Sequence, residues 1–201
     1  MFLLAAVIGS VSAQTPEDRK GPCFRGKPLP KCEVFWITEC AVLYRLDESG
    51  YDDWFKQLYY NWEIGYMVNR NEQNAIGGAL LIVHDDMIED TRIGIKFRYR
   101  YWLNHRVGLD VNPGLLFGGE YRESPGVQVS LAIMDQSMFG GNVIVEYYRY
   151  KGGANDFAWY AGLRFGSTLG IVAGIAIPVI LVLIVASEMD MSGMSDFDLH
   201  W

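Results

Sequence analysis

Polar and apolar residues alternate along much of this chain. In the segment RIGIKFRYRYW, residues 92–102, every second position from Arg92 to Arg100 is cationic or glycine, and every position between is apolar or aromatic. Successive side chains of a β-strand point to opposite faces, so we expect a strand with one basic face and one apolar face. The same period of two recurs in residues 59–68, 107–112, 127–133 and 157–165.

Eight candidate strands follow one another, each bounded by turn residues. They cover residues 33–45, 59–68, 75–84, 91–103, 107–118, 126–135, 142–150 and 156–166. Short connections without a helical pattern predict antiparallel neighbours. The fold class is therefore all-β, an antiparallel up-and-down meander of eight strands that closes into a barrel over residues 33–166. Pro113 is expected to interrupt its strand with a bulge or a kink.

The pattern changes after the eighth strand. Residues 167–186 carry no charge. As a helix, at about 1.5 Å per residue, they are long enough to cross a hydrocarbon core. Gly166, Gly170 and Gly174 have the spacing that lets a helix approach a partner closely. We predict a hydrophobic, transmembrane-like helix, followed by an acidic tail over residues 187–201.

The N-terminal residues have a different character. Residues 1–13 form an uncharged apolar run that ends in small residues, which is typical of a secretory signal peptide; a buried or membrane-embedded segment is the alternative. Residues 14–32 are polar and rich in proline, glycine and lysine, and we expect them to be flexible. Cys23 and Cys32 bracket part of this segment and could form a disulfide in an oxidising compartment, with Cys40 as a buried free thiol, although the sequence leaves other pairings open.

Composition narrows the functional classes. The net charge of −7 argues against a nucleic-acid partner, because neutralising phosphates requires a basic surplus. The acidic cluster Asp85, Asp86, Glu89 and Asp90 lacks the ligand spacing of a calcium loop, so we expect a solvated loop there. The sequence contains no nucleophile elbow, no phosphate-binding glycine loop and no metal-ligand spacing. It therefore predicts a protein that is not an enzyme and has no cofactor or metal.

Two properties of the polar strand face predict that it points into the barrel. It is rich in glycine, which suits a narrow lumen, and it carries both signs of charge, which can pair when buried. The predicted lumen charge network consists of Glu39, Glu63, Arg92, Lys96, Arg98, Arg100, Asp110, Glu146 and Arg164. The apolar face carries Trp62, Tyr66, Tyr99, Tyr101, Phe157 and Trp159, a set typical of a lipid-facing surface. The alternative is a lipocalin-like cup, tethered to a membrane by the helix, whose apolar face encloses a lipid or another apolar ligand.

The segments WEIGYMVNRNE, IGIKFRYRYWL, VGLDVNPGLLFGG and AWYAGLRFGS resemble the small eight-stranded outer-membrane β-barrel proteins of Gram-negative bacteria. The resemblance is one of pattern and covers about residues 33–166. YAGLRF, ending in Phe165, resembles the aromatic-ended last strand of such barrels, although the chain continues beyond it. The resemblance implies contact with a lipid bilayer in the bacterial cell envelope, with the outer membrane favoured and an inner-membrane anchor facing the periplasm as the alternative.

The expected role follows from the barrel size. Eight strands enclose an interior that side chains fill, so a porin channel is not expected. We therefore expect a structural, adhesive or complex-subunit role, with the glycine-lined helix as the surface that docks a partner membrane subunit.

Overall fold

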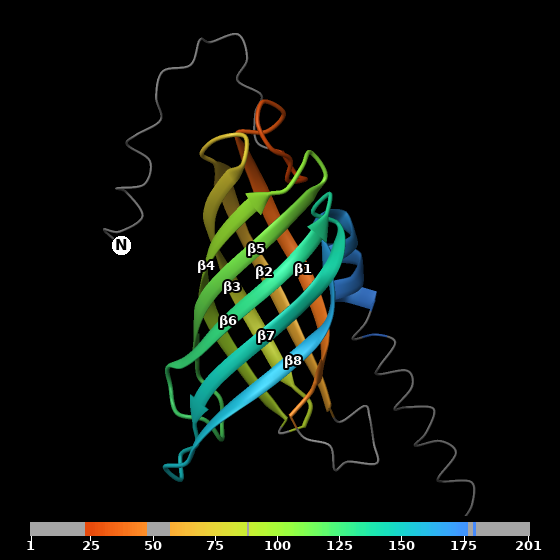
Figure 1. Ribbon diagram of the computed structural model, residues 1–201. Coiled ribbons are helices and arrows are strands. Elements are labelled where there is room, and N and C mark those ends of the chain that lie inside the picture. Colours follow the sequence, from red (N-terminus) through yellow and green to blue (C-terminus); the bar gives the residue numbers. More distant parts are fainter. Residues whose placement is uncertain (1–22, 48–56, 88, 177–178, 180–201) are drawn as a thin grey trace, which may run out of the picture.

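A computed structural model describes residues 23–47, 57–87, 89–176 and 179 of the chain. Its eight strands are β1 (Val34–Arg45), β2 (Leu58–Asn69), β3 (Asn74–Asp85), β4 (Asp90–Trp102), β5 (Val107–Phe117), β6 (Gly126–Asp135), β7 (Phe139–Arg149) and β8 (Asn155–Gly166). Each strand pairs antiparallel with the next, and β8 returns to β1 to close the barrel (Figure 1). The predicted eight-stranded antiparallel barrel is confirmed, and the predicted strand bounds agree to within three residues.

The two ends of the barrel differ in their connections. At the end where β1 begins and β8 finishes, which we name the cap end, the strands are joined by the short turns 70–73, 103–106 and 136–138. At the opposite end, which we name the loop end, the connections are 46–57, 86–89, 118–125 and 150–154. β1 therefore begins, and β8 ends, at the end with the shorter turns.

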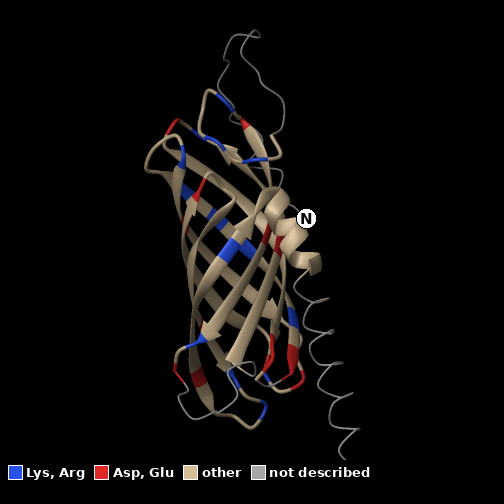
Figure 2. Ribbon diagram, turned by 90° about the vertical axis from the view of Figure 1, so that its right-hand side faces the viewer, with Lys and Arg blue, Asp and Glu red and all other residues tan. Residues whose placement is uncertain are grey.

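Side chains alternate between the barrel interior and its outer face. On β4, Phe97 points outward and is 53% exposed, whereas its neighbour Arg98 points inward and is fully buried. The outer face is apolar on every strand. It includes Trp36, Ile64, Leu80, Ile95, Val111, Leu131, Val143 and Phe157. Charged positions occur within the wall as well as at the barrel ends (Figure 2), and the mid-strand ones are buried in the interior.

The inner face is not polar throughout. Toward the loop end, a buried apolar cluster includes Leu43, Leu81, Val83, Leu116 and Ile144, together with the rings of Tyr59, Tyr148 and Tyr160. At the cap end, a second cluster consists of Phe35, Ile37, Met67, Ala75 and Trp102. The interior thus combines charged, apolar and neutral polar side chains, the last including Asn61, Asn112 and Gln128.

Two local predictions need correction. β5 runs through Pro113 without interruption. The pairing of β5 with β4 has the same register before and after the proline, but Pro113 itself has no partner residue on β4. Proline has no N–H to donate, so the ladder loses bonds there without a bulge. The segment FGG at 139–141, expected as part of a connector, is the start of β7, because it pairs with both β6 and β8.

A helix follows β8 directly and is described over residues 167–176 and at 179. It lies outside the barrel, beside β1 (Figure 1). The hydrophobic helix predicted for residues 167–186 is confirmed over this part; its remainder lies outside the described residues, as do the predicted signal peptide (1–13) and acidic tail (187–201). Within the ranges that the structure describes, no helix is both long enough and apolar enough to cross a membrane.

Two adjacent glycines of β7 differ in the space around them, and this difference shows how closely the strands approach each other. A Cβ at Gly140 would collide with the carbonyl oxygen of Ile133 and lie 2.8 Å from the sulfur of Met134. A Cβ at Gly141, on the opposite face, would have its nearest neighbour at 4.0 Å. We predict that Gly140→Ala lowers the free energy of unfolding by about 1–3 kcal/mol through overpacking. Gly141→Ala should leave it nearly unchanged. Urea-unfolding midpoints of the refolded barrels measure both, and equal shifts would contradict the close approach.

Candidate functional site

The barrel interior holds two groups of paired charges. The group nearer the cap end, which we name the cap-side cluster, consists of Glu39, Glu63, Lys96, Arg98, Arg100, Asp110 and Arg164. These side chains come from β1, β2, β4, β5 and β8, and all of them are buried. Alternation along each strand turns them inward, and closure of the sheet brings distant strands face to face. Seven of the nine predicted lumen residues therefore meet in one cluster.

Arg98 lies at the centre of the cap-side cluster. Its Nη1 donates to Glu39 Oε2 at 2.7 Å and to Glu63 Oε2 at 2.5 Å, and its Nη2 donates to Asp110 Oδ2 at 2.8 Å. One guanidinium thus joins carboxylates from β1, β2 and β5. The planar fork of arginine suits such multiple hydrogen bonding.

The other cations of the cluster share the same three carboxylates. Lys96 Nζ donates to Glu63 Oε1 at 2.6 Å. Arg100 Nε and Nη2 donate to Asp110 at 2.5 and 2.7 Å. Arg164 donates to Glu39 and also to Glu63 Oε2, the latter at 3.2 Å.

The second group, which we name the loop-side cluster, consists of Asp85, Asp90, Arg92, Arg122 and Glu146. Arg122 donates to Asp85 at 2.9 Å and to Glu146 at 3.1 Å, and Arg92 donates to Glu146. The hydroxyl of Tyr160 donates to Asp85 at 2.9 Å. The remaining two predicted lumen residues, Arg92 and Glu146, are therefore placed here.

Three members of the loop-side cluster were missed by the sequence analysis. Asp85 and Asp90 were expected in a solvated loop, but both are 1% exposed, because Asp85 ends β3 and Asp90 begins β4 on inward-facing positions. Asp90 follows the same alternation as Arg92, a signal that could have identified it. Arg122 lies in the connection 118–125, where no periodicity points to the lumen.

The two clusters balance each other in charge. The cap-side cluster has four cations and three carboxylates, for a net +1, and the loop-side cluster has two cations and three carboxylates, for a net −1. Their sum is zero. Burial of charge requires such compensation, since an unpaired ion in a low-dielectric interior is strongly disfavoured.

Arg45 and Asp47 continue the charge pairing at the mouth of the loop end. Two nitrogens of Arg45 donate to the carboxylate of Asp47, each at 3.1 Å. Partial burial acts to raise the pKa of Asp47, but the hydrogen bonds from Arg45 and from backbone N–H groups, together with the charge of Arg45, outweigh burial and hold this pKa below its ordinary value.

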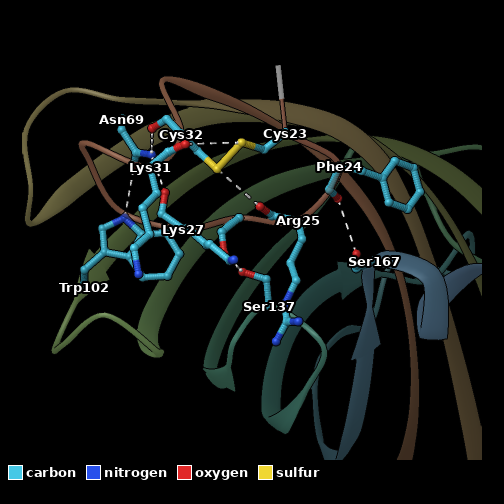
Figure 3. The surroundings of a disulfide bond; sticks show 11 residues. Cys23, Phe24, Arg25, Lys27, Lys31, Cys32, Asn69, Trp102, Ser137 and Ser167 are labelled. Atoms are coloured by element: carbon cyan, nitrogen blue, oxygen red, sulfur yellow. Dashed lines mark hydrogen bonds between the residues drawn. A yellow bond between two sulfur atoms is a disulfide. The ribbon is translucent and has the colours of Figure 1, made fainter. Parts of the chain in front are cut away.

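A small loop closes the cap end. Residues 23–32, which we name the cap, are joined by the disulfide between Cys23 and Cys32 and lie across the barrel mouth (Figure 3). The backbone of Gly26 approaches the interior so closely that a Cβ there would lie 2.7 Å from the ring of Phe35 and from Ser137 Oγ. Only glycine fits at this contact without displacement of its neighbours.

Hydrogen bonds hold the cap to several strands. Asn69 Nδ2, at the end of β2, donates to the carbonyl oxygens of Lys27 and Cys32, both at 2.7 Å (Figure 3). Ser167 Oγ, at the start of the helix, donates to the carbonyl oxygen of Phe24 at 3.3 Å. These contacts fix the part of the predicted flexible segment 14–32 that the structure describes.

The three glycines predicted for helix packing face the barrel of the same chain. A Cβ at Gly170 would collide with the carbonyl oxygen of Thr38, and one at Gly174 would lie 3.1 Å from the ring of Trp62 and 3.9 Å from Cys40 Cβ. Gly166 lies just before the helix, against Ser137 and Glu39. The helix thus covers the outward side chain of Cys40, which is fully buried although it lies on the outer face of β1.

None of this arrangement has the form of a metal centre. Among the residues that the structure describes, no group of three or more His, Cys, Asp or Glu side chains is arranged to hold a metal ion. The carboxylates of the two clusters are engaged by arginine and lysine. Their geometry supports charge neutralisation inside the barrel.

The central pairing of Arg98 is directly testable. Arg98→Met removes the guanidinium that joins Glu39, Glu63 and Asp110 and leaves the two clusters together with a net charge of −1, so we predict a loss of about 3–5 kcal/mol in the free energy of unfolding. Arg106→Met is the matched control: it breaks the pair with Asp135, in which both side chains are more than half exposed, and should cost less than about 1 kcal/mol. Denaturant titration of the refolded barrels measures the two costs. Equal costs would show that the cluster does not stabilise the fold.

Comparison of the chain with protein families, with functionally described proteins and with solved structures finds no match. The closed eight-stranded barrel expected from the resemblance to small barrel proteins is present, and the functional argument that follows rests on its geometry.

Proposed function

We propose that this chain is a non-enzymatic β-barrel protein of a bacterial cell envelope, inserted in the outer membrane, with a structural, adhesive or complex-subunit role. The observation that carries the proposal is the distribution of polarity across the wall. Phe97 and its apolar neighbours are exposed on the outer face, while Arg98 and its neighbours are buried in pairs within.

This distribution suits a bilayer as the surrounding solvent. Proteins dissolved in water seldom expose large continuous apolar patches, and here the outer face is apolar on all eight strands. Membrane barrels show this arrangement, with an apolar outer band and a polar interior. All backbone groups of a closed barrel can pair within the sheet, as a hydrocarbon environment requires.

The same observation disfavours the tethered lipocalin-like cup. A cup that binds an apolar ligand needs an apolar internal cavity. Here the interior contains two buried charge clusters and the aromatic rings of Tyr59 and Tyr160, which lie 4.1 Å apart between centroids. Such an interior offers no apolar lining around a ligand at the height of the clusters.

Two further features support an envelope location. Short turns at the end where β1 begins and β8 ends, with mostly longer loops at the other end, are typical of bacterial outer-membrane barrels. The disulfide of the cap suits an oxidising compartment outside the cytoplasm.

The filled interior supports a non-catalytic role. Every carboxylate of the two clusters is engaged by an arginine or a lysine. Catalytic carboxylates instead face a cleft that a substrate can enter. We assign the buried charges to the stability and strand register of the barrel.

The location has a direct test. Separation of inner and outer membranes should recover the protein in the outer-membrane fraction. The folded form should resist SDS without boiling and change mobility on heating. Recovery in the soluble fraction, without a heat-dependent shift, would contradict a membrane barrel.

Substitution on the outer face tests which solvent surrounds the wall. Phe97→Arg places a charge in the middle of the apolar band, at a cost of about 2–4 kcal/mol in a bilayer, and should strongly reduce the heat-modifiable form in membranes. Tyr121→Arg is the control, because Tyr121 is similarly exposed, at 49%, but lies in a connection at the loop end. It should assemble normally. Equal assembly of the two variants would place the wall in water.

A further inference from the structure

The helix that follows β8 covers only part of the outer wall. It lies over β1 and reaches the ring of Trp62 on β2, where Gly170 and Gly174 allow close approach. Two rows of outward side chains continue from beneath it across β2, β3 and β4. The rows are Trp62, Ile82 and Ile93, and next to them Ile64, Leu80 and Ile95. The helix therefore projects from the apolar outer face of the barrel and forms a step beside the two rows.

A groove runs along this step. It is lined by Ile171 of the helix on one side and by the two rows on the other, and its volume is about 570 Å³. The lining side chains remain open to the surroundings: Leu80 and Ile93 are each 62% exposed. The groove lies on the outer face, at mid-strand height, where the proposed function puts the hydrocarbon of a bilayer.

The size of the groove excludes a helix as its occupant. One turn of a helix with its side chains, about 10–12 Å wide and 5.4 Å in pitch, fills roughly 400–600 Å³. The groove thus accommodates about one turn, whereas a helix that crosses a bilayer needs about 20 residues. A β-strand has no free edge to join here, because the neighbouring strands β2, β3 and β4 are paired on both sides.

The chemistry of the lining excludes a polar occupant. The six side chains of the two rows carry no charge, and Glu39 and Glu63, which also border the groove, are engaged by arginine and lysine. A charged ligand would lose its hydration there and gain little beyond the indole N–H of Trp62. A flexible hydrocarbon chain has the width and the polarity that fit.

We propose that the groove between the helix and strands β2–β4 binds one acyl chain of a bilayer phospholipid, which the barrel retains in preference to the lipids around the rest of its wall. The inference rests on the proposed function, since it requires the wall to lie in a membrane. The helix acts as one side of the site, and its close contacts at Thr38 and Trp62 fix its position against the wall.

The native tryptophans allow a proximity test. Two full-length chains are prepared in which Phe replaces all tryptophans except Trp102 and either Trp62 or Trp159. Trp102 is buried inside the barrel and gives both chains the same background. Trp62 lines the groove, and Trp159 is an exposed outer-face residue of β8. Each chain is reconstituted in vesicles of phosphatidylcholine whose dibrominated acyl chains quench the fluorescence of nearby indoles. The vesicles are then dissolved in detergent, and gel filtration separates the protein from the lipid that it does not retain.

In vesicles, the fluorescence of both Trp62 and Trp159 should be quenched. After transfer to detergent, Trp159 should recover the emission that it has with unbrominated lipid. Trp62 should keep half of that reference emission or less. Recovery of both in parallel would overturn the retained lipid.

A groove-filling variant provides the second measurement. Leu80→Trp, in the otherwise native chain, should lower the phospholipid that mass spectrometry finds per barrel at least fivefold. Leu131→Trp, on the exposed outer face of β6, should retain about one, as the native chain does. Equal retention in the two variants, or none in the native chain, would overturn the inference. If the protein shifts in mobility on heating but retains no lipid, only the lipid site is refuted. If the chain does not insert into vesicles at all, the membrane location is refuted.

Discussion

The structure depends on one constraint: a charge that leaves water must find a partner. Closure of eight strands leaves a narrow interior, and the alternation of β4 turns Arg98 into it. Its guanidinium joins Glu39 of β1, Glu63 of β2 and Asp110 of β5. A slip of β4 by one residue would turn Arg98 outward and Phe97 inward. The buried pairs thus act against wrong registers, a specifying role that polar groups have in some other folds.

The same constraint limits what the interior can do. The two clusters have opposite net charges of one unit each, and buried rings, aliphatic side chains and neutral amides such as Gln128 and Asn142 occupy other parts of the interior. Because every carboxylate of the two clusters is engaged by an arginine or a lysine, neither cluster offers a free carboxylate to a passing ion or substrate. Recognition is therefore left to the outer wall, the connections at the loop end and the cap. This is consistent with an adhesive or complex-subunit role.

The sequence determined the architecture more fully than the site. Apolar runs bounded by turn residues located all eight strands, period-two alternation marked five of them, and the mixed charges of one face identified nine lumen residues, from Glu39 to Arg164. Asp85 was not predicted as a lumen residue because β3 is apolar on both faces, so no alternation indicated that its last residue points inward. Arg122 was not predicted as a lumen residue because it enters the lumen from the connection 118–125, where strand alternation does not apply. The contacts of Gly170 could not be predicted either, because glycine spacing shows that a helix has a close partner but not which surface that partner is.

The seam between β1 and β8 explains why the chain needs both of its flanking segments. β8 pairs with β1 only over Glu39–Arg45, so the first part of β1, toward the cap end, has no strand of the barrel on that side. The cap supplies part of the missing pairing: Cys23 N donates to Val34 O at 2.7 Å, and Trp36 N donates to Cys23 O at 3.0 Å.

The helix completes the seam. Thr38 Oγ1 donates to Ser167 O at 3.1 Å, and Ser167 Oγ in turn donates to the cap at Phe24. The two flanking segments therefore meet over the edge of β1 that β8 leaves uncovered. An exposed edge of this kind invites pairing with another chain. The cap and the helix protect it, and by lying on the outer wall the helix also creates the groove for which we propose a lipid.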